Sequence, residues 1–186
     1  MEIYRTFDEQ YQGVYLARYV NCSFYKTPKD YETELDKIQD QLQNPLYVRN
    51  FIKSTKSGWK QGSYKNDSLT FLSHQVLEEV GDLFDKLDEL TEHSQNGNCF
   101  ELLFDEFVEL SNYERLDDPG RRKMYTYDYG SLLRLYGVRV GNNCVVITGA
   151  GIKLVSKMQA LQMELDKMNY LKDWLKKENI TDCTDF

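Results

Sequence analysis

The sequence predicts an α+β fold, in which a small, antiparallel-rich sheet is packed with four to five helices. Two observations predict it. Residues 132–157 hold two β-branched, apolar runs joined across the tripeptide Gly-Asn-Asn at 141–143, which is a hairpin signal. The segments before and after this region carry apolar residues at helical spacing instead. At 186 residues, the chain is long enough for one domain with a substantial core.

An early strand is expected at residues 13–20, with the sequence GVYLARYV. The run follows a glycine and is rich in Val and Tyr, which favour strands. Its alternation is imperfect because Leu16 and Ala17 are both apolar. This pattern is typical of a strand that is covered on both faces or lies centrally in the sheet.

Two short helices are predicted next. Tyr31, Leu35, Ile38 and Leu42 recur at helical spacing. A second helix begins at Asn44-Pro45, because Asn caps helices and Pro suits the first helical position. Residues 54–66 read as a loop. Its aromatics, Trp59 and Tyr64, would either stack on RNA or pack against the core, and we favour packing.

The longest helix is expected to begin at Asp67 or Ser68. Its apolar stripe consists of Leu72, Val76, Val80, Leu83, Leu87 and Leu90. Its acidic residues, expected on a solvated opposite side, are Glu78, Glu79, Asp82, Asp85 and Asp88. A short helix is predicted around Phe100–Phe107 and a last helix at 156–177. The core stripe of the last helix is Leu161, Leu165, Met168, Leu171 and Leu175.

The predicted hairpin places side chains on two faces. Leu133 and Leu135 point to one face, and Arg134 and Tyr136 point to the other. If the leucines face the helices, Arg134 and Tyr136 lie on an open face of the sheet. The run CVVIT at 144–148 suits a central strand. Gly-Ala-Gly at 149–151 indicates a turn or a bulge before a third run that carries Lys153.

Positive charge is concentrated around this hairpin. The whole chain has a formal charge of −7, which argues against indiscriminate binding to nucleic acids or membrane surfaces. Residues 113–160, however, carry eight basic side chains against four acidic ones. Among them, Arg121-Arg122-Lys123 follows a strong turn signal, Asp-Asp-Pro-Gly at 117–120, and precedes the tyrosine-rich run MYTYDYG. Basic residues interleaved with tyrosines suit an RNA-facing edge.

Several other classes of site are not supported by the sequence. The four cysteines are widely spaced, with no C-x-x-C pair for zinc or redox chemistry. The glycines match neither a dinucleotide fingerprint nor a P-loop. We therefore expect no cofactor and no metal. The first residues, MEIYRTFDEQ, do not resemble a signal peptide, and no run suits a membrane span, so a cytoplasmic location is expected.

The segment LLRLYGVRVGNNCVVITGAGIKL, followed by a helix containing ELDKMNYLKDWL, resembles the C-terminal half of the RelE/HigB toxin superfamily. It is most similar to the phage-related HigB-like branch, and it also resembles Bacteroidetes and phage proteins without an assigned activity. The resemblance covers roughly the last 55 to 75 residues, as a pattern of elements and turns. It implies a single α+β domain over 1–180. A RelE-like core would comprise residues 99–180 and the strand at 13–20, with a helical insertion at 21–98.

The resemblance implies a metal-independent endoribonuclease of a toxin–antitoxin system, which cleaves mRNA, often on the ribosome, and pairs with an antitoxin. We expect no membrane association and no direct DNA contact. Arg134 and Lys153 would stabilise phosphate charge, and Tyr136 would transfer a proton or stack on a base. The residues that would hold the RNA backbone are Arg121, Arg122, Arg139 and Lys157.

A second interpretation is a catalytically inactive RelE-like module that binds a protein partner. The enzyme hypothesis predicts that Arg134 and Lys153 converge on an open face beside Arg122. The interaction-module hypothesis predicts that this face is covered by the protein's own helices, or that it carries a large apolar patch.

Overall fold

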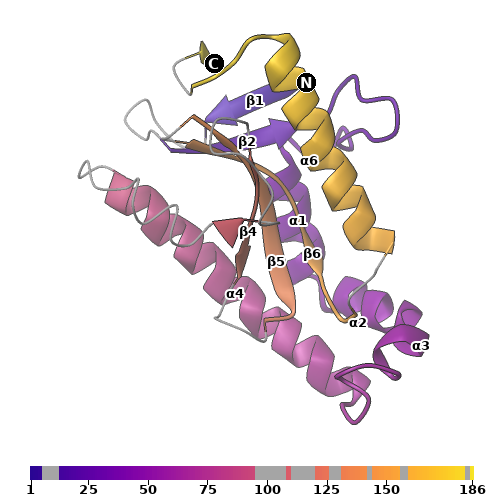
Figure 1. Cartoon of the computed structure of the whole chain (residues 1–186). Helices are drawn as coiled ribbons and strands as arrows, with labels where there is room; N and C mark the ends of the chain where they lie inside the picture. Colours follow the sequence, from indigo (N-terminus) through magenta and orange to yellow (C-terminus); the bar gives the residue numbers. More distant parts are fainter. Residues whose placement is uncertain are drawn as a thin grey trace.

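The computed structural model describes residues 1–5, 13–94, 108–109, 120–125, 131–141, 144–155, 159–182 and 185–186. They form a six-stranded sheet with the strand order β1-β2-β6-β5-β4-β3 (Figure 1). Its strands are β1 (Glu2–Arg5), β2 (Val14–Arg18), β3 (Val108–Glu109), β4 (Gly120–Tyr125), β5 (Leu133–Val140) and β6 (Cys144–Ile152). All neighbours are antiparallel except β2 and β6, which are parallel. The predicted α+β class with an antiparallel-rich sheet is confirmed.

Helices cover both faces of the sheet. In the described residues they are α1 (Glu34–Gln43), α2 (Pro45–Ser54), α3 (Lys56–Trp59), α4 (Leu69–Ser94) and α6 (Gln159–Lys177). Helix α4 runs along one face and α6 along the other (Figure 1). The helix predicted around Phe100–Phe107 lies outside the described residues.

The helix starts follow from side chains that satisfy free backbone N–H groups. Thr33 and Asp36 form a capping box at α1, each accepting from the other's backbone N–H. Asn44 accepts from the N–H groups of the next helix, whose first residue is Pro45, so the predicted start of α2 is confirmed. At α4, the Ser68 hydroxyl accepts from Phe71 N–H.

One core lies between the sheet and α4. Leu133 and Leu135 of β5 point into it, together with residues of α1 and α2. The described members of the predicted α4 stripe, Leu72, Val76, Val80, Leu83 and Leu87, are buried there. Trp59 is also buried in this core, and its indole N–H donates to Ile52 O at 2.8 Å. Packing against the core, rather than contact with RNA, is therefore confirmed for Trp59.

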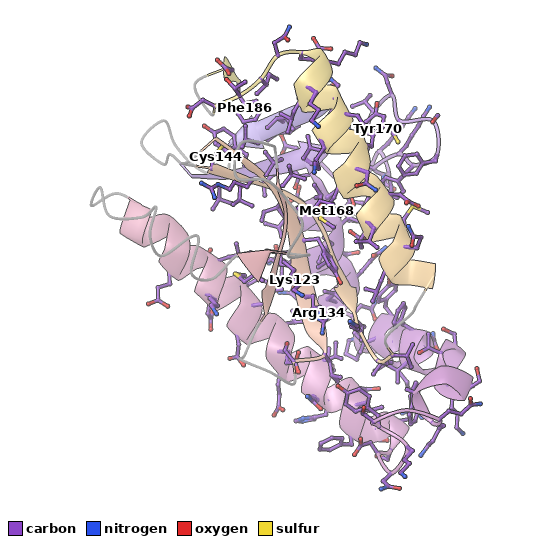
Figure 2. The ribbon with its side chains drawn as sticks, viewed as in Figure 1. Lys123, Arg134, Cys144, Met168, Tyr170 and Phe186 are labelled. Carbon is purple, nitrogen blue, oxygen red and sulfur yellow. The ribbon has the colours of Figure 1, made fainter. Side chains whose placement is uncertain are left out.

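A second core lies between the sheet and α6. Met168, Leu171 and Leu175 reach it from the helix, and Met168 is labelled between α6 and the strands in Figure 2. Tyr136 faces this core and is only 3% exposed. The prediction that Tyr136 lies on an open face is therefore wrong. Strand alternation does place it opposite the leucines, but α6 covers that side as well.

The glycines at 149–151 lie within β6 and do not form a turn, because the strand runs unbroken to Ile152. The register shifts next to them, between the pairs Tyr136–Gly149 and Gly137–Ile147. A Cβ atom at Gly149 would overlap the carboxylate of Glu164, and one at Gly151 would come within 3.0 Å of Leu161. The small residues here make room for α6, and Lys153 follows directly after the strand.

Candidate functional site

Arg134 and Lys153 lie together at one end of the hairpin. Arg134 pairs with Gly151, two residues before Lys153, across strands β5 and β6. The N–H of Lys153 donates to Leu132 O at 2.7 Å, which continues the antiparallel alignment past the end of β6. Residues two apart on a strand share a face, so the two cations are diagonal neighbours.

Both cations line a cavity of about 510 Å³. One wall comes from the start of β5 and the end of β6. The other wall comes from residues 58–64, which comprise the end of α3 and part of the connection to α4. The polar side chains around it are Gln61, Ser63, Tyr64, Ser131, Arg134 and Lys153. A cavity of this size, with two cations and an aromatic ring, suits a phosphorylated ligand.

Tyr64 brings an aromatic hydroxyl to this cavity, whereas the sequence pattern placed it in a loop and favoured packing against the core over contact with RNA. It packs against the first core and also lines the cavity. Burial, and then the negative charge of Glu79, raise the pKa of Tyr64, and the charge of Arg134 partly offsets this increase. The hydroxyl therefore stays protonated at neutral pH and can donate a hydrogen bond.

Glu79 of α4 holds the start of β5 in place. Its carboxylate accepts from the N–H groups of Leu132 and Leu133 and from the hydroxyl of Ser131, at 2.7–3.0 Å. Gln75 donates to it as well. Glu79 is fully buried, so the prediction that it belongs to a solvated acidic face is wrong. Four donors satisfy the buried carboxylate, which anchors the backbone just before Arg134.

Of the other predicted residues, none that the structure describes lines this cavity. Tyr136 is buried under α6 and does not line it. Arg139 pairs with Val145 near the far end of β5, where its Nε donates to Gly141 O at 2.8 Å. Arg121 lies on β4, opposite Val138. Lys157 and the side chain of Arg122 lie outside the described part of the chain.

Lys123 belongs to the basic run that suits an RNA-facing edge, but it was not among the residues expected to hold the RNA backbone. Lys123 lies on β4 and pairs with Tyr136 of β5, so it shares the face of Arg134. Lys123 and Arg134 are labelled next to each other in Figure 2. A positional signal existed in the sequence, since Lys123 and Arg121 are two residues apart and must share a face in a strand. The run was not predicted as a strand, however.

A second polar site lies between α1, α6 and β6, where three buried charged side chains and one partly buried lysine come together. The carboxylate of Glu34 accepts from Lys167 at 2.9 Å and from Lys37 at 2.8 Å. It also accepts from the hydroxyls of Tyr25 and Thr27. Lys167 makes a further ion pair with Glu164, at 2.8 Å. We call Glu34, Lys37, Glu164 and Lys167 the buried ion cluster.

The pKa values of this cluster follow from its burial. Burial alone would raise the pKa of Glu34, but Lys167 and Lys37 hold it below its ordinary value. Burial raises the pKa of Glu164, which Lys167 offsets only in part. Burial, and then the charge of Lys167, lower the pKa of Lys37. The two carboxylates and the two ammonium groups balance one another's charge.

The depressed pKa of Glu34 makes the protein sensitive to acid. A carboxyl with a folded-state pKa below its unfolded value stabilises the fold above the unfolded pKa, and this contribution is lost as the pH falls through the folded value. We therefore expect the free energy of unfolding to decrease as the pH drops below about 4.5, which is the ordinary pKa of a glutamate. Glu164 acts in the opposite sense, because its raised pKa favours proton uptake by the folded state.

Urea unfolding between pH 7 and pH 3 measures this loss. The variant Glu34→Gln should lose the part of the acid dependence that Glu34 causes. Glu32→Gln, which removes an exposed carboxyl two residues earlier, should keep it. Equal pH profiles for Glu34→Gln and the unchanged protein would show that Glu34 is not the responsible group.

No group of three or more metal-ligating side chains occurs in the described residues. None of the described helices is long and apolar enough to cross a membrane. Comparison with protein-family models, with curated proteins and with solved structures finds no match to this chain.

Proposed function

We propose that the chain is a metal-independent endoribonuclease of the toxin–antitoxin type, with the Arg134–Lys153 cavity as its active site. The convergence of these two cations and an aromatic hydroxyl on one cavity of about 510 Å³ supports this proposal. Cleavage of RNA at neutral pH needs charge stabilisation at the phosphate and a proton for the leaving oxygen, and neither requires a metal.

The proposed reaction is transesterification. The 2′-oxygen attacks the phosphorus, the bond to the 5′-oxygen breaks, and a 2′,3′-cyclic phosphate forms. Arg134 and Lys153 stabilise the charge that builds up on the phosphoryl oxygens. Tyr64 donates its proton to the leaving 5′-oxygen and regains one, through solvent, from the 2′-hydroxyl. Tyr64 thus takes the role expected of Tyr136, which is buried elsewhere.

The neighbouring strand extends the positive surface. Lys123 and Arg121 of β4 share the face of Arg134. In this proposal they hold the RNA backbone beside the cleaved bond, as phosphate contacts without base specificity. Raising the salt concentration should therefore weaken RNA binding.

The test uses purified protein, a fluorescently labelled single-stranded RNA and EDTA. The unchanged protein should produce fragments that end in a 2′,3′-cyclic phosphate. The double variant Arg134→Ala/Lys153→Ala should lose at least about 100-fold in rate, as expected for removal of groups that stabilise the transition state. The matched control, Arg49→Ala/Lys53→Ala, removes two exposed cations of α2 and should cleave normally. Circular dichroism checks that each variant is folded.

A second candidate is an inactive module that binds a protein partner such as an antitoxin. The observation that favours it is the burial of Tyr136 under α6, since this hypothesis predicts a sheet face covered by the protein's own helices. Absence of RNA cleavage by the folded protein, together with absence of growth arrest on expression, would favour this second candidate over the nuclease.

A further inference from the structure

A second cavity, of about 120 Å³, borders the buried ion cluster. It lies between α1, α2, the C-terminal end of β6 and the first turns of α6. Its polar wall carries Lys37, Gln41 and Glu164. Its apolar wall includes Ile38, Leu42 and Phe51. The cavity is thus charged at one side and apolar at the other, as small-molecule sites are.

The backbone of β6 presents hydrogen-bonding groups to this cavity. Strand β2 pairs with β6 only from Val145 to Ile147, so the described residues supply no strand beside the C-terminal end of β6 on that side. The hydrogen bond between Lys153 and Leu132 fixes the alternation of the β5–β6 ladder. By this alternation, Ala150 and Ile152 turn their N–H and C=O groups away from β5, toward the cavity that both residues line.

Glu164 supplies an acceptor to the same cavity. It is only 8% exposed and lines the cavity wall. Among the described residues its ion-pair partner is Lys167, whose Nζ lies 2.8 Å from Oε2, yet this buried oxygen accepts no hydrogen bond of good geometry. The carboxylate therefore has acceptor capacity left for a donor in the cavity, and a buried carboxylate gains strongly from an additional donor.

Lys37 supplies a donor. Its ammonium group donates to Glu34 and to the hydroxyl of Tyr25. An ammonium carries three protons, so one remains for an acceptor in the cavity. The cavity therefore offers a negative group, a positive group and, between them, backbone N–H and C=O groups on a strand edge.

We propose that this cavity binds a small α-amino acid in its zwitterionic form. The ammonium group would donate to Glu164, and the carboxylate would accept from Lys37. The remaining protons of the ammonium group would donate to carbonyl groups on the edge of β6, and the second carboxylate oxygen would accept from an N–H group there. The buried ion cluster has two charges of each sign, and a zwitterion keeps this balance. A lone amine or carboxylate would leave a buried net charge.

The pKa shifts of the cluster agree with this ligand. Burial raises the pKa of Glu164 and lowers that of Lys37, so each group gains from an opposite charge brought close to it.

The size of the cavity sets the selectivity among amino acids. It is somewhat smaller than the cavity of roughly 150 Å³ that accepts benzene, with six heavy atoms. Glycine and alanine fit this limit, and leucine does not.

Isothermal titration calorimetry of the whole chain with glycine and L-alanine tests the proposal. Both should bind in a saturable way. Propionate, which lacks the ammonium group, propylamine, which lacks the carboxylate, and L-leucine, which is too large, should each bind at least about tenfold more weakly. Equal binding of propionate or propylamine would overturn the proposal. Absence of binding by glycine and alanine would also overturn it, and would leave a cavity that holds only water.

Variants locate the binding. Glu164→Gln should weaken alanine binding at least about tenfold, since a hydrogen bond to a charged group is lost. Glu178→Gln, an exposed change just after α6, is the matched control and should bind normally. If Glu164→Gln does not fold, Gln41→Phe provides the second test, because it fills the cavity from a partly exposed position of α1 without altering the ion cluster. Unchanged binding in Gln41→Phe would overturn the assignment.

Discussion

Replacing Lys167 by methionine is expected to lower the free energy of unfolding by about 3–5 kcal/mol. Lys167 is fully buried and forms ion pairs with both Glu34 and Glu164. Methionine keeps most of the side-chain volume, so the loss would come from the two carboxylates left near one remaining cation. Urea unfolding monitored by circular dichroism measures the change.

Two comparisons separate this effect from a general effect of the substitution. Lys177→Met, at the exposed end of α6, should change stability by less than about 0.5 kcal/mol. In the Lys167→Met background, adding Glu164→Gln should recover part of the loss, because it removes one of the unpaired charges. A Lys167→Met protein as stable as the unchanged one would show that the ion pairs are not retained in solution.

Gly149→Ala is the second change with a large expected effect, a loss of about 3 kcal/mol. The new methyl group would overlap the carboxylate of Glu164 and lie 2.5 Å from Lys167 Nζ. Both atoms are the ends of flexible side chains, but they form an ion pair and are buried between α6, to which they belong, and the sheet, so they cannot easily move aside. The substitution therefore either separates the ion pair or pushes α6 away from the sheet.

Gly81→Ala provides the matched control. Gly81 lies within α4, and apart from the adjacent backbone of its own helix no atom of the described residues lies within 4 Å of the position of an added Cβ. Alanine should stabilise the helix there by up to about 1 kcal/mol, because it restricts the unfolded chain and favours helix. A similar loss of stability in both variants would contradict the proposed cause, since only Gly149 has charged neighbours.

Much of the fold could be predicted because its signals are local. Asn44-Pro45 marks a helix start by satisfying N–H groups a few residues away, and the Gly141 turn marks the β5–β6 hairpin within its own strands. The α4 stripe is likewise a property of one helix. These elements depend on neighbours in the sequence, so their residues alone predict them.

The candidate site could be predicted only in part. Alternation placed Arg134 and Tyr136 on one face, but it could not say that α6 covers Tyr136, because that helix comes from a later segment. The buried ion cluster had only half a signal. Glu34 comes four residues before Ile38 and Lys167 four residues before Leu171, so each has the spacing of the buried side of its helix. Spacing within one helix cannot show that the two side chains pair, because 133 residues separate them. Tyr64 reaches the first cavity for the same kind of long-range reason.

The parallel pair of β2 and β6 determines the order in which the chain can assemble. Val14 pairs with Val145, so a loop of about 130 residues must close before β2 gains its central neighbour. During synthesis, β1 and β2 can pair early, and α1 to α4 emerge next, but the inner edge of β2 stays open until β6 is made. A nascent or truncated chain that lacks β6 would therefore expose this edge to other strands, and aggregation is its expected fate.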